Sequence, residues 1–530
     1  TMKKLIYLFL ALIIVACSSD GDSNGGDNNA NCEYTLNSLA VTNSINDSAT
    51  FNGIISLNSN CEFPITEQGF VYATTIQPTL NNNKINVNGT DVSITIENLE
   101  PNTTYYVRTF LTNALGEFYG NEINFISNNA VYLADNGVTI KAYEWSNIGD
   151  TGIVNGETYT VVDEAMLQAM LDNEEDVTKA VTSKVTSMAE LFFMGNGSPN
   201  SFNQYIGNWD VSNVTTMQFM FRNTTFNQDI SNWDVSNVTN MRGMFQDATS
   251  FNQPIGSWDV SSVTYMNTNY SNGYNVGMFY NATSFNQPIG NWDVSSVNDM
   301  SGMFTAATAF NQPIGNWDVS SVNNMNGMFN GAASFNQPIG NWDVSSVNDM
   351  SYMFSNTTVF NQPIGNWDLS NVNMNGMFSG AASFNQPIGN WETTFTFVAR
   401  MFQNATSFNQ DISNWDVSNN ITLSQMFSGA TSFNQDISNW DVSNVTDMSS
   451  MFNDAYAFNQ PIYSWDVSNV TNMASMFNSA TAFNQDLQIW DIYSVYYCLN
   501  FCLGATSWVL DKPSNLSSCT GDGGTSVGCP

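Results

Sequence analysis

The most regular feature of the sequence is an alternation of apolar and polar positions that returns about every 25 residues. In the copy that begins at Phe433, Trp440 and Val442 alternate with polar residues over 440–443. A period of two places successive side chains on opposite faces of the backbone, so this segment predicts a short β-strand.

A second apolar pattern follows the predicted strand in each copy. In the copy that begins at Phe433 its members are Met448, Met451, Phe452 and Ala455. Their spacing is that of one face of a helix, and the hydroxyl of Thr446 is placed to cap a free amide of the first turn. Each copy is therefore predicted to be a short strand followed by a short helix.

The repeated unit opens with Phe-Asn-Gln, and this opening marks twelve copies. They begin at Phe202, Phe226, Phe251, Phe285, Phe310, Phe335, Phe360, Phe384, Phe408, Phe433, Phe458 and Phe483. Neighbouring openings are 24 or 25 residues apart, except for one gap of 34. Such a period is typical of stacked units that bury their apolar faces against their neighbours. The predicted fold class over 202–503 is a repeat solenoid with Trp and Phe columns in its core and stacked Asn-Gln pairs bridging adjacent copies.

The repeat resembles that of the BspA-like leucine-rich-repeat surface proteins, in the branch whose unit reads W-D-V-S-x-V-x-x-M-x-x-M-F. The resemblance covers residues 130–503. It implies a leucine-rich-repeat-like solenoid of parallel β-strands and short helices, exposed at a bacterial surface. Adhesion or binding of host proteins is attributed to some members of the family, and the resemblance implies no particular ligand.

Residues 32–127 have a different pattern. Short alternating runs cover 49–57, 68–74, 92–96, 104–112 and 118–125. Turns rich in Asn, Gly and Pro separate them, which predicts an antiparallel β-sandwich. The segment Leu99-x-Pro101-x-Thr103-x-Tyr105 resembles the tyrosine-corner segment of fibronectin type III domains. The resemblance implies a spacer between anchor and repeats, with a binding role as the alternative.

Residues 130–201 are predicted to form a cap that covers the apolar side of the first repeat. The segments 138–143 and 157–162 are interpreted as strands, and Asp163 as the N-cap of a helix. The apolar stripe of this helix consists of Met166, Leu167, Met170 and Leu171.

The first residues indicate export. We expect the chain to start at Met2, and residues 1–17 to be a lipoprotein signal peptide, because Lys3 and Lys4 precede a 12-residue apolar run that is too short to span a bilayer. The segment Ile14-Val15-Ala16-Cys17 resembles a lipobox, in which Cys17 is lipidated; the alternative is an ordinary signal with Cys17 lost. Residues 18–31 are interpreted as a flexible tether. Residues 18–22 resemble the acidic export signal of surface lipoproteins, so we expect outer-membrane anchoring at the cell surface through the N-terminal lipid only.

Three segments depart from the repeat. Nine extra residues between Met266 and Met278 make a candidate binding loop with Tyr270 and Tyr274, unless the insertion is neutral. The copy at Trp391 has Glu392, Phe395 and Phe397, which is interpreted as a local bend, an aromatic contact patch or neutral divergence. The copy at Trp415 has Asn420 in place of the usual Val and Leu423 in place of Met, which is interpreted as neutral. After the repeats, residues 504–530 are interpreted as a C-terminal cap and tail.

Charge and composition exclude several classes of function. The net charge is −35, with a pI of about 4.1, and only Arg222, Arg242 and Arg400 are basic between residues 202 and 490. Nucleic-acid binding is excluded because it needs clustered Lys and Arg, and docking on anionic lipid is disfavoured for the same reason. The sequence has no His, which removes Ser-His-Asp and Cys-His catalysis. The acidic residues form a repeated series rather than one unique set, so we predict that the protein is not an enzyme.

Seven cysteines remain to be explained. With Cys17 assigned to lipid, Cys32 and Cys61 are a candidate disulfide of the sandwich. The others lie near the C-terminus: Cys498, Cys502, Cys519 and Cys529. Three pairings of these four are possible, and disulfides at the ends of an exported chain prevent fraying. A zinc site is the alternative, although the spacing lacks paired C-x-x-C motifs.

One acidic position recurs on the predicted outer face of the strands. The candidate ligand-binding residues are Asp293, Asp318, Asp343, Asp368, Asp416, Asp441 and Asp466, and we call them the acidic row. Stacked carboxylates repel one another, so each is expected to accept bonds from Ser hydroxyls or backbone amides of the next copy, with some titrating high. The alternative is that the row binds Ca²⁺ or a basic partner. No other cofactor is expected.

These observations give two hypotheses of function. The first is a surface-anchored adhesin that binds an extracellular protein or glycan of a host or neighbouring cell. The second is a structural or scaffolding surface-layer protein without a discrete ligand.

Overall fold

A computed structural model describes residues 32–45, 48–58, 61–100, 103–127, 129–193, 195, 197–269, 275–369, 372–391, 397–516, 519 and 529. The chain divides into two compact units. The first contains the residues up to Leu133 and Ile140–Val161, and the second contains Ala134–Thr139 and Val162–Pro530. This division assigns 140–161 of the predicted cap region to the first unit and 162–201 to the second.

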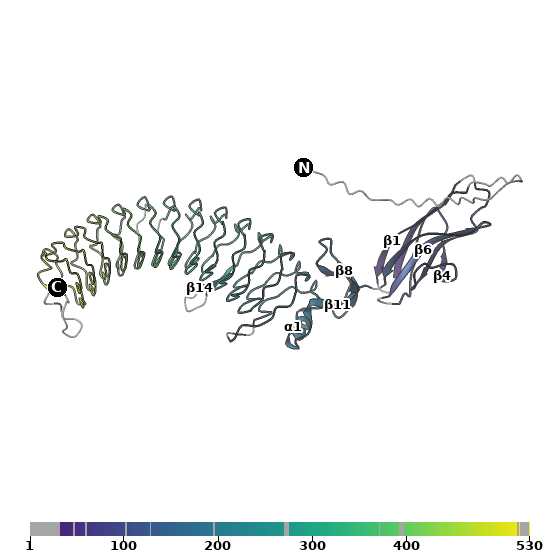
Figure 1. The fold of residues 1–530 in the computed structure, drawn as a ribbon, viewed down its shortest axis with the longest axis horizontal. Coiled ribbons are helices and arrows are strands. Elements are labelled where there is room, and N and C mark those ends of the chain that lie inside the picture. Colours follow the sequence, from purple (N-terminus) through teal and green to yellow (C-terminus); the bar gives the residue numbers. More distant parts are fainter. Residues whose placement is uncertain are drawn as a thin grey trace, which may run out of the picture. The chain divides into compact units, whose positions relative to one another are not determined.

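Two antiparallel sheets make up the N-terminal part of the first unit, as the sequence predicts (Figure 1). Their strands are β1 (Tyr34–Ile45), β2 (Ser48–Leu57), β3 (Glu67–Ala73), β4 (Asn83–Asn86), β5 (Asp91–Ile96), β6 (Thr104–Asn113) and β7 (Gly116–Ile126). One sheet has the order β1-β2-β5 and the other has the order β4-β3-β6-β7. Alternate residues of β2 and β6, such as Phe51 and Val107, are fully buried in a shared core. The unit is therefore sandwich-like, with apolar side chains facing inward at the period of a strand.

The sequence pattern predicts five of these strands and misses β1 and β4. Strand β1 carries Asn, Ser and Thr, and its pairing with β2 is interrupted by register shifts after Leu39 and after Thr42. These bulges break the strict alternation on which a strand prediction depends. Strand β4 is four residues long and has no buried member, so it leaves no apolar signal.

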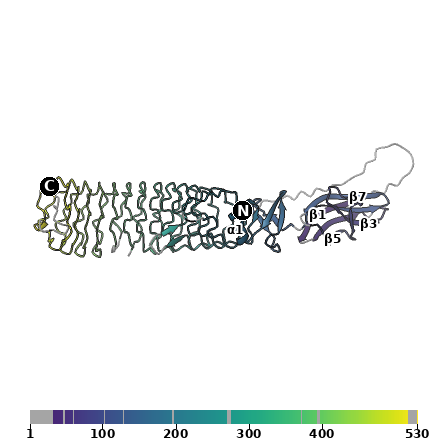
Figure 2. The same cartoon turned by 90° about the horizontal axis from the view of Figure 1, so that it is seen from below.

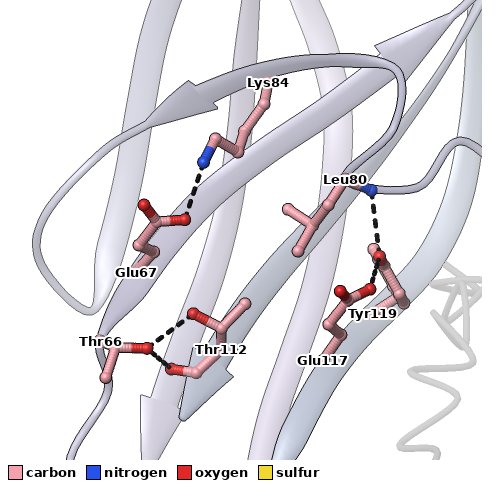
Figure 3. Close-up of polar contacts among 7 residues, drawn as sticks. All are labelled: Thr66, Glu67, Leu80, Lys84, Thr112, Glu117 and Tyr119. Atoms are coloured by element: carbon pink, nitrogen blue, oxygen red, sulfur yellow. Dashed lines mark hydrogen bonds and ion pairs between the residues drawn. The ribbon is translucent and has the colours of Figure 1, made fainter.

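Polar contacts link strands of the second sheet to one another and to a loop (Figure 3). The Lys84 Nζ lies 2.7 Å from the Glu67 Oε2, which joins β4 to β3. The Tyr119 hydroxyl donates to the Glu117 Oε2 at 2.7 Å and accepts from the Leu80 N–H at 3.0 Å. Because these groups are largely exposed, each pair contributes no more than about 1 kcal/mol to the free energy of unfolding.

Two small hairpins complete the described part of the first unit. Strand β8 (Val131–Leu133) pairs with β9 (Ile140–Ala142), and β10 (Thr151–Val154) pairs with β11 (Glu157–Val161). The predicted strands at 138–143 and 157–162 correspond to β9 and β11, and their partners β8 and β10 were not predicted.

The second unit begins with helix α1 (Glu164–Asp172), followed by a 3-10 turn, η1 (Val177–Lys179), and by β12 (Ala180–Val181). The Asp163 Oδ1 accepts from the Met166 N–H at 2.8 Å, which confirms the predicted N-cap. Leu167 is fully buried, and the other members of the predicted stripe pack against the same core. The helix therefore covers the first apolar layer of the repeats.

The twelve repeats lie side by side in sequence order (Figures 1 and 2). We number them 1 to 12 and count positions from the opening Phe as position 1. The N–H at position 16 donates to the carbonyl at position 15 of the next repeat, as from Met300 to Asn324 and from Met325 to Asp349, at 2.9 and 2.8 Å. Parallel β-bridges join Asp299, Asn324 and Asp349 in succession. Backbone pairing therefore runs from repeat to repeat.

The predicted positions of the strand and helix within the repeat are wrong. In the copy at Phe433 the bridging residue is Asp447, and 440–443 is not in a strand. The Asp441 Oδ1 accepts from the Ser443 N–H at 3.0 Å, and this local bond bends the chain away from an extended conformation. Trp440 and Val442 are both buried although turns precede and follow them, so alternate burial here does not indicate a strand.

The segment predicted as a helix forms consecutive turns. Ser450 and Asp454 have φ values of 55° and 56°, which an α-helix does not allow. The N–H groups of Met448 and Ser450 donate to carbonyls of repeat 11, at 2.9 and 2.8 Å. These bonds replace the bonds that a helix would make within one repeat, because the neighbouring repeat supplies an acceptor at each second residue.

The interior of the repeats is a continuous aromatic and aliphatic core, as predicted. The twelve Trp side chains at position 8 are at most 4% exposed. Phe rings of adjacent repeats are stacked nearly parallel, with centroids 5.7 Å apart for Phe304 and Phe329 and 6.1 Å apart for Phe310 and Phe335. In repeats 2 to 12 the Trp also donates its indole N–H to the Ile carbonyl of the preceding repeat, as Trp317 does to Ile289 at 3.1 Å, whereas Trp209 of repeat 1 donates to the Val177 carbonyl.

The insertion in repeat 3 forms a hairpin of β13 (Asn267–Asn269) and β14 (Asn275–Gly277). The Asn267 Nδ2 donates to the Ser301 Oγ at 2.7 Å, which ties the base of the hairpin to repeat 4. The candidate loop residues Tyr270 and Tyr274 lie outside the described residues.

Candidate binding surface of the repeated region

A ladder of Asn and Gln side chains joins the repeats at positions 2 and 3, as the sequence predicts. The Asn311 Oδ1 accepts from the backbone N–H of Asn336 at 3.0 Å and from the Gln337 Nε2 at 2.9 Å. The same Gln337 Nε2 also lies 3.0 Å from the Asn311 carbonyl oxygen. Equivalent bonds recur along the array. The ladder fixes the register of the turns that precede each exposed segment.

The acidic row is exposed at position 9 along the repeats. The Asp318 Oδ1 accepts from the Ser320 N–H at 3.1 Å and from the Ser320 Oγ at 2.6 Å. Asp293, Asp343 and Asp441 make the same pair of bonds to the Ser two residues later. Asp416 and Asp466 accept from the corresponding N–H, and Asp368 is exposed next to a segment outside the described residues. Six of the seven carboxylates are therefore oriented by a donor of their own repeat.

From the sequence, the Ser and amide donors are expected in the next copy, and some of the carboxylates are expected to titrate high. Both expectations are corrected, because the donors lie in the same repeat and lower the pKa wherever a shift is found. Hydrogen bonds from the Ser hydroxyl and then the Ser N–H lower the pKa below its ordinary value for Asp259, Asp318, Asp343, Asp441 and Asp466. The charge of a neighbouring carboxylate acts in the opposite direction on Asp343 and Asp466 but is the smallest contribution. Donors two residues away thus favour the ionised form of these five carboxylates.

The described residues contain no group of three or more Asp, Glu or Cys side chains arranged to hold a metal ion. Within these residues, the members of the row act as single carboxylates. The alternative in which the row chelates Ca²⁺ therefore gains no support from its geometry, while binding of a basic partner along the row is compatible with it.

The six described cysteines form three disulfides. Cys32 pairs with Cys61, Cys498 with Cys519, and Cys502 with Cys529, at Cα–Cα distances of 4.6, 6.3 and 4.7 Å. The predicted staples are confirmed, and one of the three possible C-terminal pairings is selected. The zinc alternative fails for these four cysteines because each sulfur is bonded to another sulfur. The lipidation candidate Cys17 and the variant position Glu392 lie outside the described residues.

The N-terminal edge of the repeats is closed by a carboxylate. Backbone N–H groups at position 14 donate to the preceding repeat, as Thr215 does to the Thr186 carbonyl at 2.9 Å. No repeat precedes Thr186, and its N–H donates instead to the Glu164 Oε1 at 2.7 Å, with the Ser187 N–H at 3.2 Å from the same oxygen. Desolvation raises the pKa of Glu164, but the bonds from Thr186 and Ser187 together lower it below its ordinary value.

The last repeat carries exposed apolar side chains that sequence reasoning missed. Ile489, Tyr493, Tyr496 and Tyr497 are 72%, 88%, 57% and 44% exposed, and we call them the terminal patch. They occupy positions 7, 11, 14 and 15, where the other repeats mostly have Asn, Ser, Thr or Asp. A comparison of repeat 12 with the consensus at outward positions would have found them. The Tyr496 and Tyr497 rings meet at 84° with centroids 4.8 Å apart.

In the described part of the chain, no helix combines the length and hydrophobicity needed to cross a membrane.

The repeated region matches one family, described as "Mycoplasma protein of unknown function, DUF285", at residues 162–276, 274–391, 339–424 and 396–511. No curated protein matches the chain. No solved structure matches it either. The four matches overlap and together span 162–511, which is well over half of the sequence and coincides with the turn-and-ladder repeats described above. The chain is therefore a repeat protein that belongs to the DUF285 family, whose function is unknown.

Proposed function

We propose that this protein is a surface lipoprotein whose repeated region is a leucine-rich-repeat-like solenoid of the BspA-like kind, and that this solenoid binds an extracellular protein or glycan. The N-terminal sandwich is proposed to be a fibronectin type III-like spacer. Cys17 is the proposed site of lipid attachment to the outer membrane, and the lipid is the only membrane anchor in this proposal.

The solenoid assignment rests on the direction of backbone bonding. Parallel bridges and position-16 hydrogen bonds connect each repeat to its neighbour, and the core is continuous from Val162 to Leu516. The sandwich assignment is supported by Tyr105, whose hydroxyl accepts from the Glu100 N–H at 3.1 Å, five residues upstream. A tyrosine bonded back to the preceding chain in this way is a feature of such sandwiches.

The observation that carries the binding proposal is the repetition of the same outward polar groups. The acidic row presents oriented carboxylates at one position of successive repeats, while most apolar residues of the repeats are buried in the core. A surface of this kind suits an extended macromolecular ligand better than a small molecule, which needs a concave site. We infer that the protein binds and does not catalyse, because its outward groups are a series of equivalents and the sequence contains no His.

Binding is tested with the full chain on a panel of immobilised extracellular-matrix proteins and glycans. A variant with Asp318→Asn, Asp343→Asn and Asp441→Asn removes three charges of the row but keeps the acceptor oxygens that Ser320, Ser345 and Ser443 use. We expect this variant to lose binding to the retained ligand, while the sandwich variant Glu67→Gln keeps it. If no member of the panel is retained although the protein is displayed at the surface, the scaffolding hypothesis replaces the binding proposal.

Anchoring is tested separately in cells. Labelled palmitate is expected to be incorporated into the wild-type protein and not into Cys17→Ser, and external protease is expected to degrade the wild type in intact cells. Equal labelling of both proteins, or complete protection from protease, would refute the lipid anchor or the surface location respectively.

A further inference from the structure

We propose that the terminal patch binds an arginine-bearing, basic polypeptide segment, with a guanidinium group placed on the ring of Tyr497. This inference deepens the proposed binding function by naming the chemical class of the partner and its site. It rests on the repeat geometry around position 15 and on the charge of the last repeats.

The repeats follow a simple pairing rule on this surface. In several repeats the side chain at position 17 contacts the side chain at position 15 of the next repeat. The Gln218 Oε1 accepts from the Asn240 Nδ2 at 3.1 Å, which is one example. The Asn326 Nδ2 lies 3.4 Å from the Asp349 Oδ2, which is another. In these repeats position 17 therefore supplies one contact of position 15, which elsewhere also bonds to position 15 of a neighbour or to position 17 of its own repeat.

The same rule holds an arginine against a tyrosine in repeats 2 and 3. Arg242 occupies position 17 and Tyr265 occupies position 15 of the following repeat. The Arg242 guanidinium carbon lies 4.3 Å from the centroid of the Tyr265 ring. A guanidinium at this distance from an aromatic face is attracted by the ring quadrupole. The chain thus contains one filled example of the contact that we propose.

Repeat 12 has the tyrosine without the arginine. Tyr497 occupies position 15, as its parallel bridge with Asn472 and the bridge of Tyr265 with Asn240 both show. Position 17 of the preceding repeat is Ala474, whose methyl group is too short to cover a neighbouring ring. Tyr496 stands at 84° to Tyr497, so the two rings form a corner beside the position that Arg242 fills in repeat 2.

The charge around the corner selects a cation. Residues 433–511 contain eight Asp and no Lys or Arg. Asp491 lies in the same repeat and is exposed, and its Oδ1 accepts from the Tyr493 N–H at 3.1 Å. Because Tyr493 replaces the Ser of other repeats, Asp491 lacks the hydroxyl donor that Asp318 and Asp441 receive at 2.6 and 2.7 Å. Its oxygens are thus more available to a donor from a partner, and a second copy of this acidic chain is disfavoured as that partner.

The test measures binding of the full chain to a fluorescent peptide of alternating Arg and Ser. Its counterpart with citrulline keeps the shape of each arginine and removes the charge. We expect the citrulline peptide to bind at least about 10-fold more weakly, and Tyr497→Ala to weaken Arg-peptide binding by roughly 2- to 30-fold, the range of one cation–π contact. Tyr497→Phe keeps the ring face and should retain most of the affinity. Tyr205→Ala, an exposed tyrosine of repeat 1, is the control and should have no effect.

Two further variants use the internal example directly. Ala474→Arg places an arginine against Tyr497 as Arg242 lies against Tyr265, and it is expected to block the peptide without removing the tyrosine. Arg242→Ala uncovers Tyr265 and is expected to add a second, weaker site. Neither change alters a core residue, and thermal unfolding of each variant confirms that it is folded.

Several outcomes would overturn the proposal. Equal binding of the Arg and citrulline peptides would do so, as would an unchanged affinity in Ala474→Arg. Self-association in sedimentation that Ala474→Arg abolishes would make the patch an interface between copies instead. If the panel identifies a ligand that depends on the acidic row while the two peptides bind alike, this inference fails and the proposed function stands. If no member of the panel is retained while Ala474→Arg blocks the Arg peptide, the terminal patch is confirmed as the peptide site and the proposed function of the acidic row fails.

Discussion

At the scale of single residues, polar side chains complete the backbone bonding between repeats. The Asn at position 2 serves one N–H and one side-chain amide of the next repeat through a single oxygen. The Trp at position 8 donates its indole N–H to an Ile carbonyl of the preceding repeat, so the buried indole has a hydrogen-bond partner. Conserving these residues in nearly every copy therefore maintains hydrogen bonds in the interior, where a lost partner costs about 1–3 kcal/mol.

Asn311 allows this requirement to be measured. Asn311→Ala removes the acceptor of the Asn336 N–H and of the Gln337 side chain, and we expect the free energy of unfolding to fall by about 1–3 kcal/mol. Asn311→Asp retains the oxygen and should cost clearly less. Urea unfolding gives the free energies, and hydrogen exchange at Asn336 reports the local bond. Identical exchange at Asn336 in wild type and Asn311→Ala would contradict the role of this oxygen.

The pKa values of the acidic row give a second prediction at this scale. Bonds from the Ser320 hydroxyl and N–H lower the pKa of Asp318 below 3.8. A folded-state pKa below the unfolded value means that the stabilisation is fully present above about pH 4 and is lost as the pH falls through the folded pKa. Ser320→Ala should therefore raise the pKa of Asp318, with Ser320→Thr closer to wild type. An NMR titration of the Asp318 carboxyl carbon measures it, and an unchanged value would show that the hydroxyl is not the cause.

At the scale of elements, the sequence predicts which residues are buried better than it predicts the conformation that buries them. Trp440, Val442, Met451 and Phe452 are all in the core, as their apolar character requires. Their spacing within one repeat matches the periods of a strand and a helix, and so it predicted those two elements. The decisive bonds of Met448 and Ser450 are to another repeat, and a pattern read within one repeat cannot contain them.

For the candidate site too, the exposure of the residues was predicted correctly and their bonding was not. The exposed position of the acidic row was predictable, because Asp alternates with buried Trp and Val in each copy. The donor to Asp318 was placed in the wrong repeat, because a strand would put Ser320 on the same face but about 6–7 Å along the chain, too far to donate to its own carboxylate. Tyr493 and Tyr497 were not predicted because they replace polar residues within a repeat of regular length, where no insertion marks them.

Helix α1 provides a prediction at the scale of elements. Its first residue, Glu164, takes the place of a missing repeat by accepting from the Thr186 and Ser187 N–H groups. Glu164→Ala should leave both donors without this acceptor and increase hydrogen exchange over 186–192, whereas Glu164→Gln keeps one oxygen and should have a smaller effect. Because the folded-state pKa of Glu164 is lowered, acidification through that pKa should increase exchange in the wild type and not in Glu164→Gln. Equal exchange in all three proteins at neutral pH would show that the edge needs no carboxylate.

At the scale of the whole molecule, the two ends of the repeats differ in chemistry. At the N-terminal end, α1 covers the first apolar layer and Glu164 accepts the N–H groups of Thr186 and Ser187. The C-terminal end carries the exposed terminal patch and two disulfides, in a stretch of repeats that lacks cations. A repeat protein with one closed end and one chemically distinct end favours recognition of a partner over polymerisation in series.

The equivalence of the repeats predicts that a whole one can be removed. Deleting 310–334 joins Ala309 to Phe335, and the core residues of repeat 5 have counterparts of the same type in repeat 6. The Trp342 indole N–H should then donate to the Ile289 carbonyl in place of the Ile314 carbonyl, to which it now donates at 3.2 Å. We expect a folded protein whose indoles stay protected from iodide quenching, with a slightly lower unfolding midpoint. Deleting 310–321 instead removes half a repeat, puts polar positions opposite the core, and should expose several indoles. Equal quenching in the two deletions would mean that the register of the stack, set by backbone and Asn bonds between whole repeats, does not determine the fold.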